Sequence, residues 1–294
     1  MSDDECRKIE ELIVRYELEP KIRDVYVEGS SDKSLIDWFL KEMGIDGVVV
    51  YEISTVEIDA EKVAEHGEEN NNRGRVITLA YEMESMFGNE ALQITCIADN
   101  DFDLILNKKY DCGLILFTDY SCLEMYLFKE NCMDKYFKLC LQGFSVNVNE
   151  IMDCLSKVLQ EVFLIRLANK VLGLNMTWIT FDRCCSVSDK GIILDVDDYI
   201  TRYLNSNGWP VKKKEFFAVI EDWRPRLRND CRCQMNGHDF MELLAWFISK
   251  HGIDRRLYDT EVVCRSLYGC IEIEDLKSEM LFKNLVSRVR VNGS

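Results

Sequence analysis

The stretch that decides the fold is Ile94-Thr95-Cys96-Ile97-Ala98-Asp99-Asn100-Asp101-Phe102-Asp103, where an apolar run ends in three aspartates at alternate positions. The run Ile94–Ala98 has the length and composition of a buried strand. If the extended geometry continues, Asp99 and Asp101 point to the same side of the chain. Carboxylates that lie so close repel each other unless a cation or a shared proton lies between them. Because Mg²⁺ prefers such oxygen ligands, the pattern indicates metal-dependent phosphate chemistry.

Three more strand-like runs alternate with helix-like segments. The runs are Asp24–Val27, Val48–Ile53 and Gly113–Thr118. Apolar residues at helical spacing predict helices over 30–43 and 76–87, and the polar stretch 57–75 is typical of a loop. Such alternation with short connections predicts an α/β fold with a mostly parallel sheet flanked by helices.

Acidic side chains follow these strands. Glu28 and Gly29 come directly after the first strand, and Asp32 lies in the first turn of the next helix. In open α/β sheets, ligands bind at the carboxyl ends of the strands. Asp32 is equally typical of a helix-start acid. Glu28 could be a solvated turn residue, but Gly29 permits close approach of a backbone or substrate, which favours a functional role.

After residue 130 the pattern changes to long helical segments. An apolar helix is predicted over 151–172, possible strands over 177–181 and 191–194, and helices near 195–205, 212–221, 238–251 and 274–288. We therefore expect three segments: an N-terminal helix over 1–19, an α/β domain over 20–130, and a mainly α-helical C-terminal domain over 131–294.

The second half contains one basic run with an aromatic residue. Arg224, Arg226 and Arg228 follow Trp223 and could contact a phosphate backbone, although a surface turn is the more common role of such a run. His238 could carry a proton or contact phosphate, although helix capping is commoner. Cys231, Cys233 and His238 lack a fourth ligand at the usual spacing, so zinc is not favoured.

Composition narrows the class of protein. The chain has 294 residues, a net charge of −16 and 13 scattered cysteines. Reduced thiols of this kind fit a cytoplasmic location, and the acidic first residues fit no signal peptide. No run is long and apolar enough for a membrane helix, so no membrane partner is expected. The negative charge argues against a general nucleic-acid coat protein and favours a partner with a positive surface, but it allows a nuclease with a local basic strip.

Other interpretations of the aspartates are weaker. A calcium loop beginning at Asp99 would need glycine at its sixth position and glutamate at its twelfth, where Leu104 and Tyr110 stand. A phosphatase with Asp99 as nucleophile would not need Glu28. A structural acidic turn is disfavoured by the Glu28-Gly29 pair upstream. The ordered combination is more specific than any one of these signals.

The motifs Val27-Glu28-Gly29-x-x-Asp32 and Ile97-Ala98-Asp99-Asn100-Asp101-Phe102-Asp103 resemble the TOPRIM (topoisomerase-primase) domain, closest to the overcoming-lysogenization-defect (OLD-like) branch of nucleases. The segments Thr118–Leu127 and Asn236–Asp239 resemble a narrower group of stand-alone TOPRIM proteins, which includes the effector of the PARIS anti-phage system. The resemblance covers roughly residues 20 to 130 and extends only faintly beyond them.

The resemblance implies a role for each matching residue. Glu28 would be the metal-associated general acid/base, Asp99 and Asp101 the principal ligands of Mg²⁺ or Mn²⁺, and Asp32 would support a second metal ion. Asp103 and Glu124 would be outer acids around the site. The activating lysine of OLD-like nucleases has no convincing match, and Lys33, Lys108 and Lys109 are the available residues.

The resemblance also implies a biological role. The protein would be a toxic antiviral nuclease that cleaves RNA, plausibly tRNA, and that forms a homodimer when active. A separate ATPase of the same defence system would restrain it, because this chain has no G-x-x-x-x-G-K-[ST] motif. The alternatives are a DNA nuclease of the OLD-like type and a non-catalytic protein that binds a metal or a partner.

Overall fold

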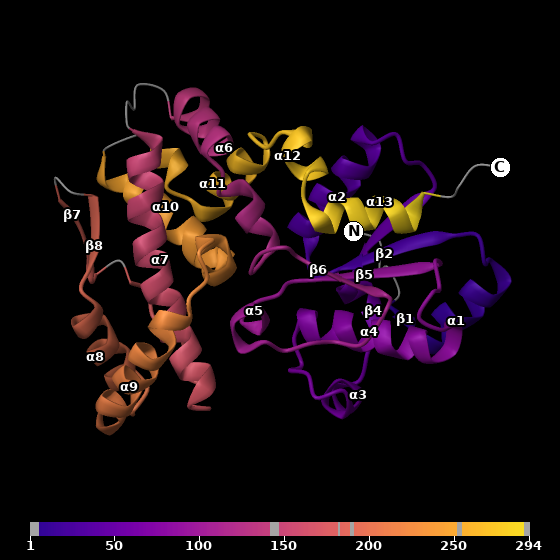
Figure 1. The fold of residues 1–294 in the computed structure, drawn as a ribbon, viewed down its shortest axis with the longest axis horizontal. Helices are drawn as coiled ribbons and strands as arrows, with labels where there is room; N and C mark the ends of the chain where they lie inside the picture. Colours follow the sequence, from indigo (N-terminus) through magenta and orange to yellow (C-terminus); the bar gives the residue numbers. More distant parts are fainter. Residues whose placement is uncertain (1–5, 142–146, 182, 189–190, 252–254, 291–294) are drawn as a thin grey trace. The chain divides into compact units, whose positions relative to one another are not determined.

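The computed structural model describes residues 6–141, 147–181, 183–188, 191–251 and 255–290. The chain divides into two compact units (Figure 1). Unit 1 comprises Met1–Asn100, Lys109–Asp119 and Glu272–Ser294, and unit 2 comprises Asp101–Lys108 and Tyr120–Ile271. These units differ from the segments expected from the sequence. Unit 1 also includes Glu272–Ser294, and unit 2 also includes the short segment Asp101–Lys108.

Unit 1 contains a four-stranded sheet in which every neighbouring pair is parallel. The strands, in spatial order, are β3 (Val48–Glu52), β2 (Arg23–Val27), β5 (Ile94–Ala98) and β6 (Ile115–Phe117). The register pairs Tyr26 with Cys96 and Ala98 with Phe117, so the carboxyl ends of these strands meet at one edge. The predicted α/β class with a parallel sheet is confirmed.

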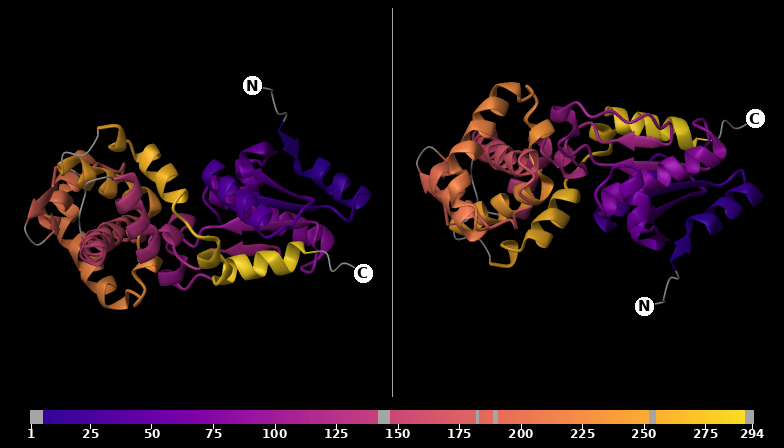
Figure 2. Two further views of the ribbon diagram at one scale, coloured as in Figure 1. Left: turned by 90° about the horizontal axis from the view of Figure 1, so that it is seen from above. Right: turned by 90° about the horizontal axis from the view of Figure 1, so that it is seen from below.

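Helices cover both faces of this sheet. The helices of unit 1 are α1 (Ile9–Leu18), α2 (Ser30–Glu42), α3 (Ala60–Glu65), α4 (Asn72–Phe87), α12 (Ile273–Lys277) and α13 (Met280–Val289). Figures 1 and 2 show α1 and α4 on one face and α2 and α13 on the other. Buried Leu12 and Tyr16 of α1 join Ile77 of α4 in the core of the first face. On the second face, the rings of Phe39 and Phe282 lie 4.6 Å apart.

Hydrogen bonds near both ends of helix α13 hold it to the rest of unit 1. The Asp119 carboxylate accepts a hydrogen bond from the backbone N–H of Leu281 over 3.1 Å, in the first turn of α13. Near the other end, the Arg288 guanidinium donates to Thr95 Oγ1 and to the carbonyl oxygens of Ala91 and Ile94. Burial lowers the pKa of Arg288 below its usual range. These contacts explain why a segment distant in sequence belongs to the sheet unit.

The described residues of unit 2 form mostly helices, together with a two-stranded antiparallel sheet. Its elements are α5 (Asp103–Leu106), α6 (Glu130–Lys135), α7 (Val148–Val171), β7 (Cys185–Ser188), β8 (Gly191–Leu194), α8 (Val196–Ser206), α9 (Lys213–Trp223), α10 (Gly237–Lys250) and α11 (Thr260–Tyr268). Within the described ranges, no helix has both the length and the apolar content needed to cross a bilayer.

Several local predictions need correction. The segment 177–181 forms no strand, because its residues pack as an irregular segment in which the Ile179 carbonyl accepts a hydrogen bond from Tyr199. The segment 57–75 is not all loop, since α3 and the start of α4 lie in it. The helix predicted over 274–288 is broken into α12 and α13, because the Glu279 backbone is extended. The N-terminal helix predicted over 1–19 starts later than expected. Residues 1–5 lie outside the described residues, and α1 begins at Ile9. Before it, a two-residue strand, β1 (Arg7–Lys8), pairs with β4 (Val56–Glu57).

Candidate functional site

The carboxyl edge of the sheet in unit 1 brings Glu28 and Asp99 together. Glu28 follows β2 and Asp99 follows β5, and these two strands are adjacent and parallel. The backbone N–H of Asp99 donates a hydrogen bond to Glu28 Oε1 over 2.8 Å. Both side chains are half-buried. The predicted convergence of these two acids at one sheet edge is therefore present.

The start of α4 closes around this pair, which the sequence did not indicate. Asn72 donates from Nδ2 to the Glu28 carbonyl oxygen over 2.9 Å, and Arg73 donates from Nε to the Asp99 carbonyl oxygen over 2.6 Å. Arg73 is buried, and its guanidinium lies 5.7 Å from the centroid of the Tyr110 ring. The Arg73 guanidinium therefore places a positive charge beside the backbone of Asp99, and the same group lies 3.6 Å from Glu68 Oε2.

A sequence signal for this helix start existed. Asn71 caps α4, because its side-chain oxygen accepts a hydrogen bond from the Gly74 backbone N–H over 2.8 Å. An asparagine directly before an apolar helical pattern is a typical N-cap. Gly74 cannot carry a larger side chain, since an added Cβ would lie 2.0 Å from the Glu69 carbonyl oxygen.

Asp32 and Lys33 take part in holding α2. Asp32 Oδ2 accepts a hydrogen bond from the backbone N–H of Gly29 over 3.0 Å, which is the helix-start role considered for it. Lys33 Nζ donates to Asp37 Oδ2 over 2.8 Å and to the Val50 carbonyl oxygen over 2.7 Å. Since Val50 lies in the middle of β3, Lys33 is engaged away from the carboxyl end of that strand.

The end of β6 completes the edge in unit 1. Thr118 is buried, and its Oγ1 accepts a hydrogen bond from the Asn100 backbone N–H over 3.1 Å. Asn100 Nδ2 also donates to the Thr118 carbonyl oxygen. These two residues tie the segment after Asp99 to the neighbouring strand.

Asp101 begins unit 2, and its backbone overturns one expectation. Its φ is 47°, in the left-handed region, so the extended geometry does not continue from Asp99 through Asp101. The Asp101 N–H donates to the Ser121 carbonyl oxygen over 2.7 Å, and the Ser121 N–H donates to the Arg232 carbonyl oxygen over 3.1 Å. Asp103, the first residue of α5, is buried.

Unit 2 also brings together two motifs that are distant in sequence. The segment around Glu124 is a short 3-10 helix over Leu123–Leu127. A Cβ added to Gly237 would lie 2.4 Å from Glu124 Oε2, so the Glu124 carboxylate packs against the first residue of α10. Ser121 Oγ donates to the Met235 carbonyl oxygen, just before α10. The Thr118–Leu127 and Asn236–Asp239 motifs therefore meet at Glu124 and Gly237, and Ser121 binds the residue just before the second motif.

The first turn of α10 carries two more engaged side chains. Arg166 of α7 holds buried Asp239 with two hydrogen bonds of 2.6 and 2.7 Å, and its guanidinium lies 3.7 Å from the centroid of the Trp178 ring. His238 Nε2 lies 3.2 Å from Glu242 Oε1, and this hydrogen bond raises the pKa of His238.

The three arginines predicted to contact nucleic acid have partners inside unit 2. Arg224 donates from Nη2 to Glu161 Oε2 over 2.9 Å, Arg226 to Asp222 Oδ2 over 2.6 Å, and Arg228 to the Leu104 carbonyl oxygen over 2.6 Å. These contacts give each side chain a role in the fold. Their contact with nucleic acid stays a prediction.

The carboxylates at the sheet edge are of the chemical kind that Mg²⁺ prefers. Mg²⁺ in phosphate-handling sites is typically held by one or two carboxylates, with waters and substrate oxygens completing the shell. Glu28 and Asp99 supply two such carboxylates from adjacent strands. Among the described residues, no group of three or more histidine, cysteine, aspartate or glutamate side chains is arranged to hold a metal ion.

Neither the models of known protein families nor the curated protein sequences match this chain.

Proposed function

We propose that the protein is a metal-dependent nuclease whose reaction centre is the carboxyl edge of the sheet in unit 1. The observation that carries this proposal is the pairing of Glu28 and Asp99 across two adjacent parallel strands, with the Asp99 N–H bound to Glu28 Oε1 at 2.8 Å. Two acids at this edge are suited to phosphate chemistry, because ligands of open parallel sheets bind there. The resemblance of the motifs to OLD-like TOPRIM nucleases points the same way.

The proposed roles follow from the chemistry of each group. Asp99 would hold Mg²⁺ or Mn²⁺, and the ion would neutralise charge on the phosphate. For Asp101, the role of metal ligand rests on the resemblance alone. Glu28 would move a proton at the reacting oxygen, since its carboxylate is already oriented by the Asp99 backbone. Arg73 would act as a positioning residue, because its guanidinium binds the Asp99 carbonyl oxygen.

The substrate and partners of the proposal rest on the resemblance. RNA, with tRNA as the leading candidate, would be cut by an active homodimer, and a separate ATPase would restrain the protein until infection. The net charge of −16 supports a partner with a positive docking surface. Because the chain is negatively charged, binding of the substrate's phosphate backbone also requires metal ions or a local basic strip.

One experiment tests the proposal directly. Purified protein is incubated with total RNA and with plasmid DNA, in Mg²⁺ or in EDTA, beside the Glu28→Gln variant. Discrete RNA fragments that require Mg²⁺ and vanish in the variant are expected. Cleavage of DNA alone would replace RNA by DNA as the substrate. Absence of cleavage of either, also after co-expression with the proposed ATPase partner and its trigger, would overturn the proposal.

A second candidate, a non-catalytic regulatory protein, is favoured by one observation. Oε1 of Glu28 and Oδ2 of Asp32 both accept backbone N–H groups, as structural acids do. In that case the acidic edge would bind Mg²⁺ or a basic loop of a partner. Calorimetry with Mg²⁺ and salt-dependent binding to the partner, without nuclease activity, would support this function.

A further inference from the structure

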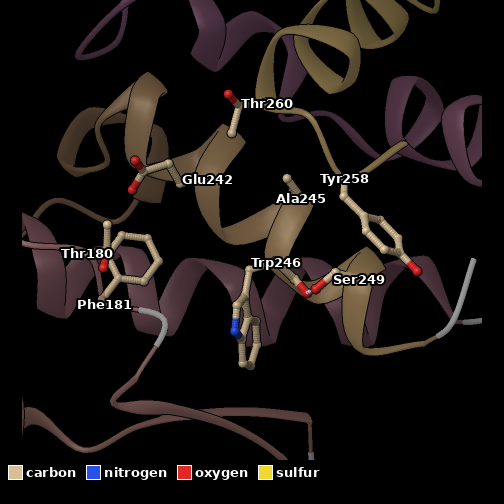
Figure 3. Close-up of a pocket in the computed structure, with 8 residues that line it drawn as sticks. All are labelled: Thr180, Phe181, Glu242, Ala245, Trp246, Ser249, Tyr258 and Thr260. Atoms are coloured by element: carbon tan, nitrogen blue, oxygen red, sulfur yellow. Dashed lines mark hydrogen bonds between the residues drawn. The ribbon is translucent and has the colours of Figure 1, made fainter. Parts of the chain in front are cut away.

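A cavity of about 420 Å³ lies along one face of α10, inside unit 2 (Figure 3). Glu242, Ala245, Trp246 and Ser249 contribute to its wall. They share one face of the helix because their spacing is i, i+3, i+4 and i+7. The volume falls within the range of about 300–1,000 Å³ that is usual for small-molecule sites.

Aromatic rings form much of the cavity wall. Trp246 projects from α10, Phe181 lies on one side of it in the view of Figure 3, and Tyr258 lies on the other. Aromatic faces carry a negative potential and attract ammonium groups that lie within about 6 Å of the ring centroid. Trp246 already makes one such contact, since Lys250 Nζ lies 5.4 Å from its ring centroid.

The charge of the lining selects the sign of the ligand. Among the described residues that line the cavity, Glu242 is the charged one, and none of them is a lysine or an arginine. Its Oε1 lies 3.2 Å from His238 Nε2, and 25% of its side chain is exposed. A bound anion would meet this carboxylate and the negative ring faces, whereas a cation is attracted by both and would share them with the side chains of His238 and Lys250.

We propose that this cavity binds an organic cation, with an alkylammonium group held among Trp246, Phe181 and Tyr258 and its charge neutralised by Glu242. A bare metal ion fits poorly, because a single carboxylate among aromatic rings provides too few oxygen ligands. The ammonium can belong to a free quaternary amine or to a lysine side chain of a partner. The proposal is independent of the nuclease reaction, since it concerns other residues and another ligand.

Calorimetry on the full chain provides the test. Three probes are used: choline, the uncharged choline isostere in which carbon replaces nitrogen, and the amide of lysine acetylated at its α-nitrogen, whose side-chain ammonium group is free. Choline is expected to bind with one site per chain and the isostere to bind at least about tenfold more weakly, which is the effect of one charge interaction. Tighter binding of the lysine amide than of choline would identify a protein side chain as the source of the cation.

Matched variants separate this site from general attraction to an acidic protein. Glu242→Gln is expected to weaken choline binding by about tenfold, and Trp246→Leu by about 3- to 30-fold. Glu215→Gln on α9 removes an exposed, ion-paired carboxylate that lies outside the cavity lining and should leave binding unchanged. Equal binding of choline and its isostere, undiminished binding by Glu242→Gln in a folded variant, or no binding of either ammonium probe would overturn the proposal.

Discussion

The backbone N–H of Asp99 and the Oε1 atom of Glu28 are joined by a hydrogen bond of 2.8 Å that links the ends of two adjacent parallel strands. The bond directs the Glu28 side chain toward the end of β5. It places a carboxylate beside the chain segment that begins with Asp99. Substitutions that keep or remove single atoms of this arrangement can therefore separate chemistry from folding.

Glu28→Gln keeps an acceptor oxygen for the Asp99 N–H but removes the charge. We expect metal-dependent cleavage to fall by about 10²-fold or more, as for loss of a general acid or base. The free energy of unfolding should change by less than about 1 kcal/mol. Cleavage rates and urea denaturation measure the two effects. Glu61→Gln, an exposed acid of α3, is the matched control. Wild-type cleavage by Glu28→Gln would contradict the assigned role.

Asp32 allows the metal role to be separated from the helix-start role. Its Oδ2 accepts the Gly29 N–H over 3.0 Å, and Asp32→Asn retains an acceptor there, whereas Asp32→Ala does not. Asp32→Ala should lower the free energy of unfolding by about 1 kcal/mol, and Asp32→Asn by clearly less. If Asp32 supports a metal ion, both variants lose cleavage activity. An active, stable Asp32→Asn variant would leave this residue a purely structural role.

Arg73 is expected to stabilise the site through the Asp99 backbone. Arg73→Leu leaves the Asp99 carbonyl oxygen and the buried Glu68 carboxylate without this partner, 2.6 and 3.6 Å away. The free energy of unfolding should fall by about 1–3 kcal/mol, measured by urea denaturation. Arg265→Leu, which removes a mostly exposed arginine, should change it by about 0.5 kcal/mol or less. Equal effects of the two substitutions would refute the special role of Arg73.

Gly237 and Glu124 should be energetically coupled. Gly237→Ala places a Cβ 2.4 Å from Glu124 Oε2 and 2.6 Å from its Cδ, so the carboxylate must move. We expect a loss of about 1–3 kcal/mol in the free energy of unfolding. In a Glu124→Ala background the same substitution should cost much less, which a double-mutant cycle detects. Strict additivity of the two substitutions would show that the contact is not made in solution.

His238 should titrate above its ordinary pKa. The hydrogen bond to Glu242 raises this pKa from the usual 6.5. Because the folded-state pKa is the higher one, the pair contributes stability that is fully present below about pH 6.5 and is lost as the pH rises through the folded-state pKa. The contribution is small, since 69% of the His238 side chain is exposed. An NMR titration of the three histidines should show this shift, and Glu242→Gln should reverse it. A pKa unchanged by Glu242→Gln would exclude the pair.

The local sequence pattern was sufficient to predict the parallel sheet and the place of two acids at its edge. Short apolar runs such as Ile94–Ala98 have few alternatives to a buried strand, and helical segments between them require parallel pairing. Once the strands are parallel, residues that directly follow them share one edge. The proximity of Glu28 and Asp99 was therefore predictable from the sequence.

The backbone just beyond that edge was not predictable in the same way. Asp101 adopts a left-handed conformation that is costly for a residue with a side chain, by about 1–2 kcal/mol. It is held there by the Ser121 carbonyl oxygen, 2.7 Å from its N–H. Local propensity gave extended geometry because it contains no information on a partner 20 residues further along the chain.

By itself the sequence determined the alternation of strands and helices, the parallel sheet and the two acids that follow β2 and β5. Only the tertiary structure decided that α13 packs on the sheet through Arg288, that Arg73 binds the Asp99 carbonyl, and that Glu124 lies against Gly237. The physical reason is the range of the interactions. Hydrophobic periodicity acts between near neighbours, whereas a buried guanidinium or carboxylate is placed by whichever distant backbone group can satisfy its hydrogen bonds.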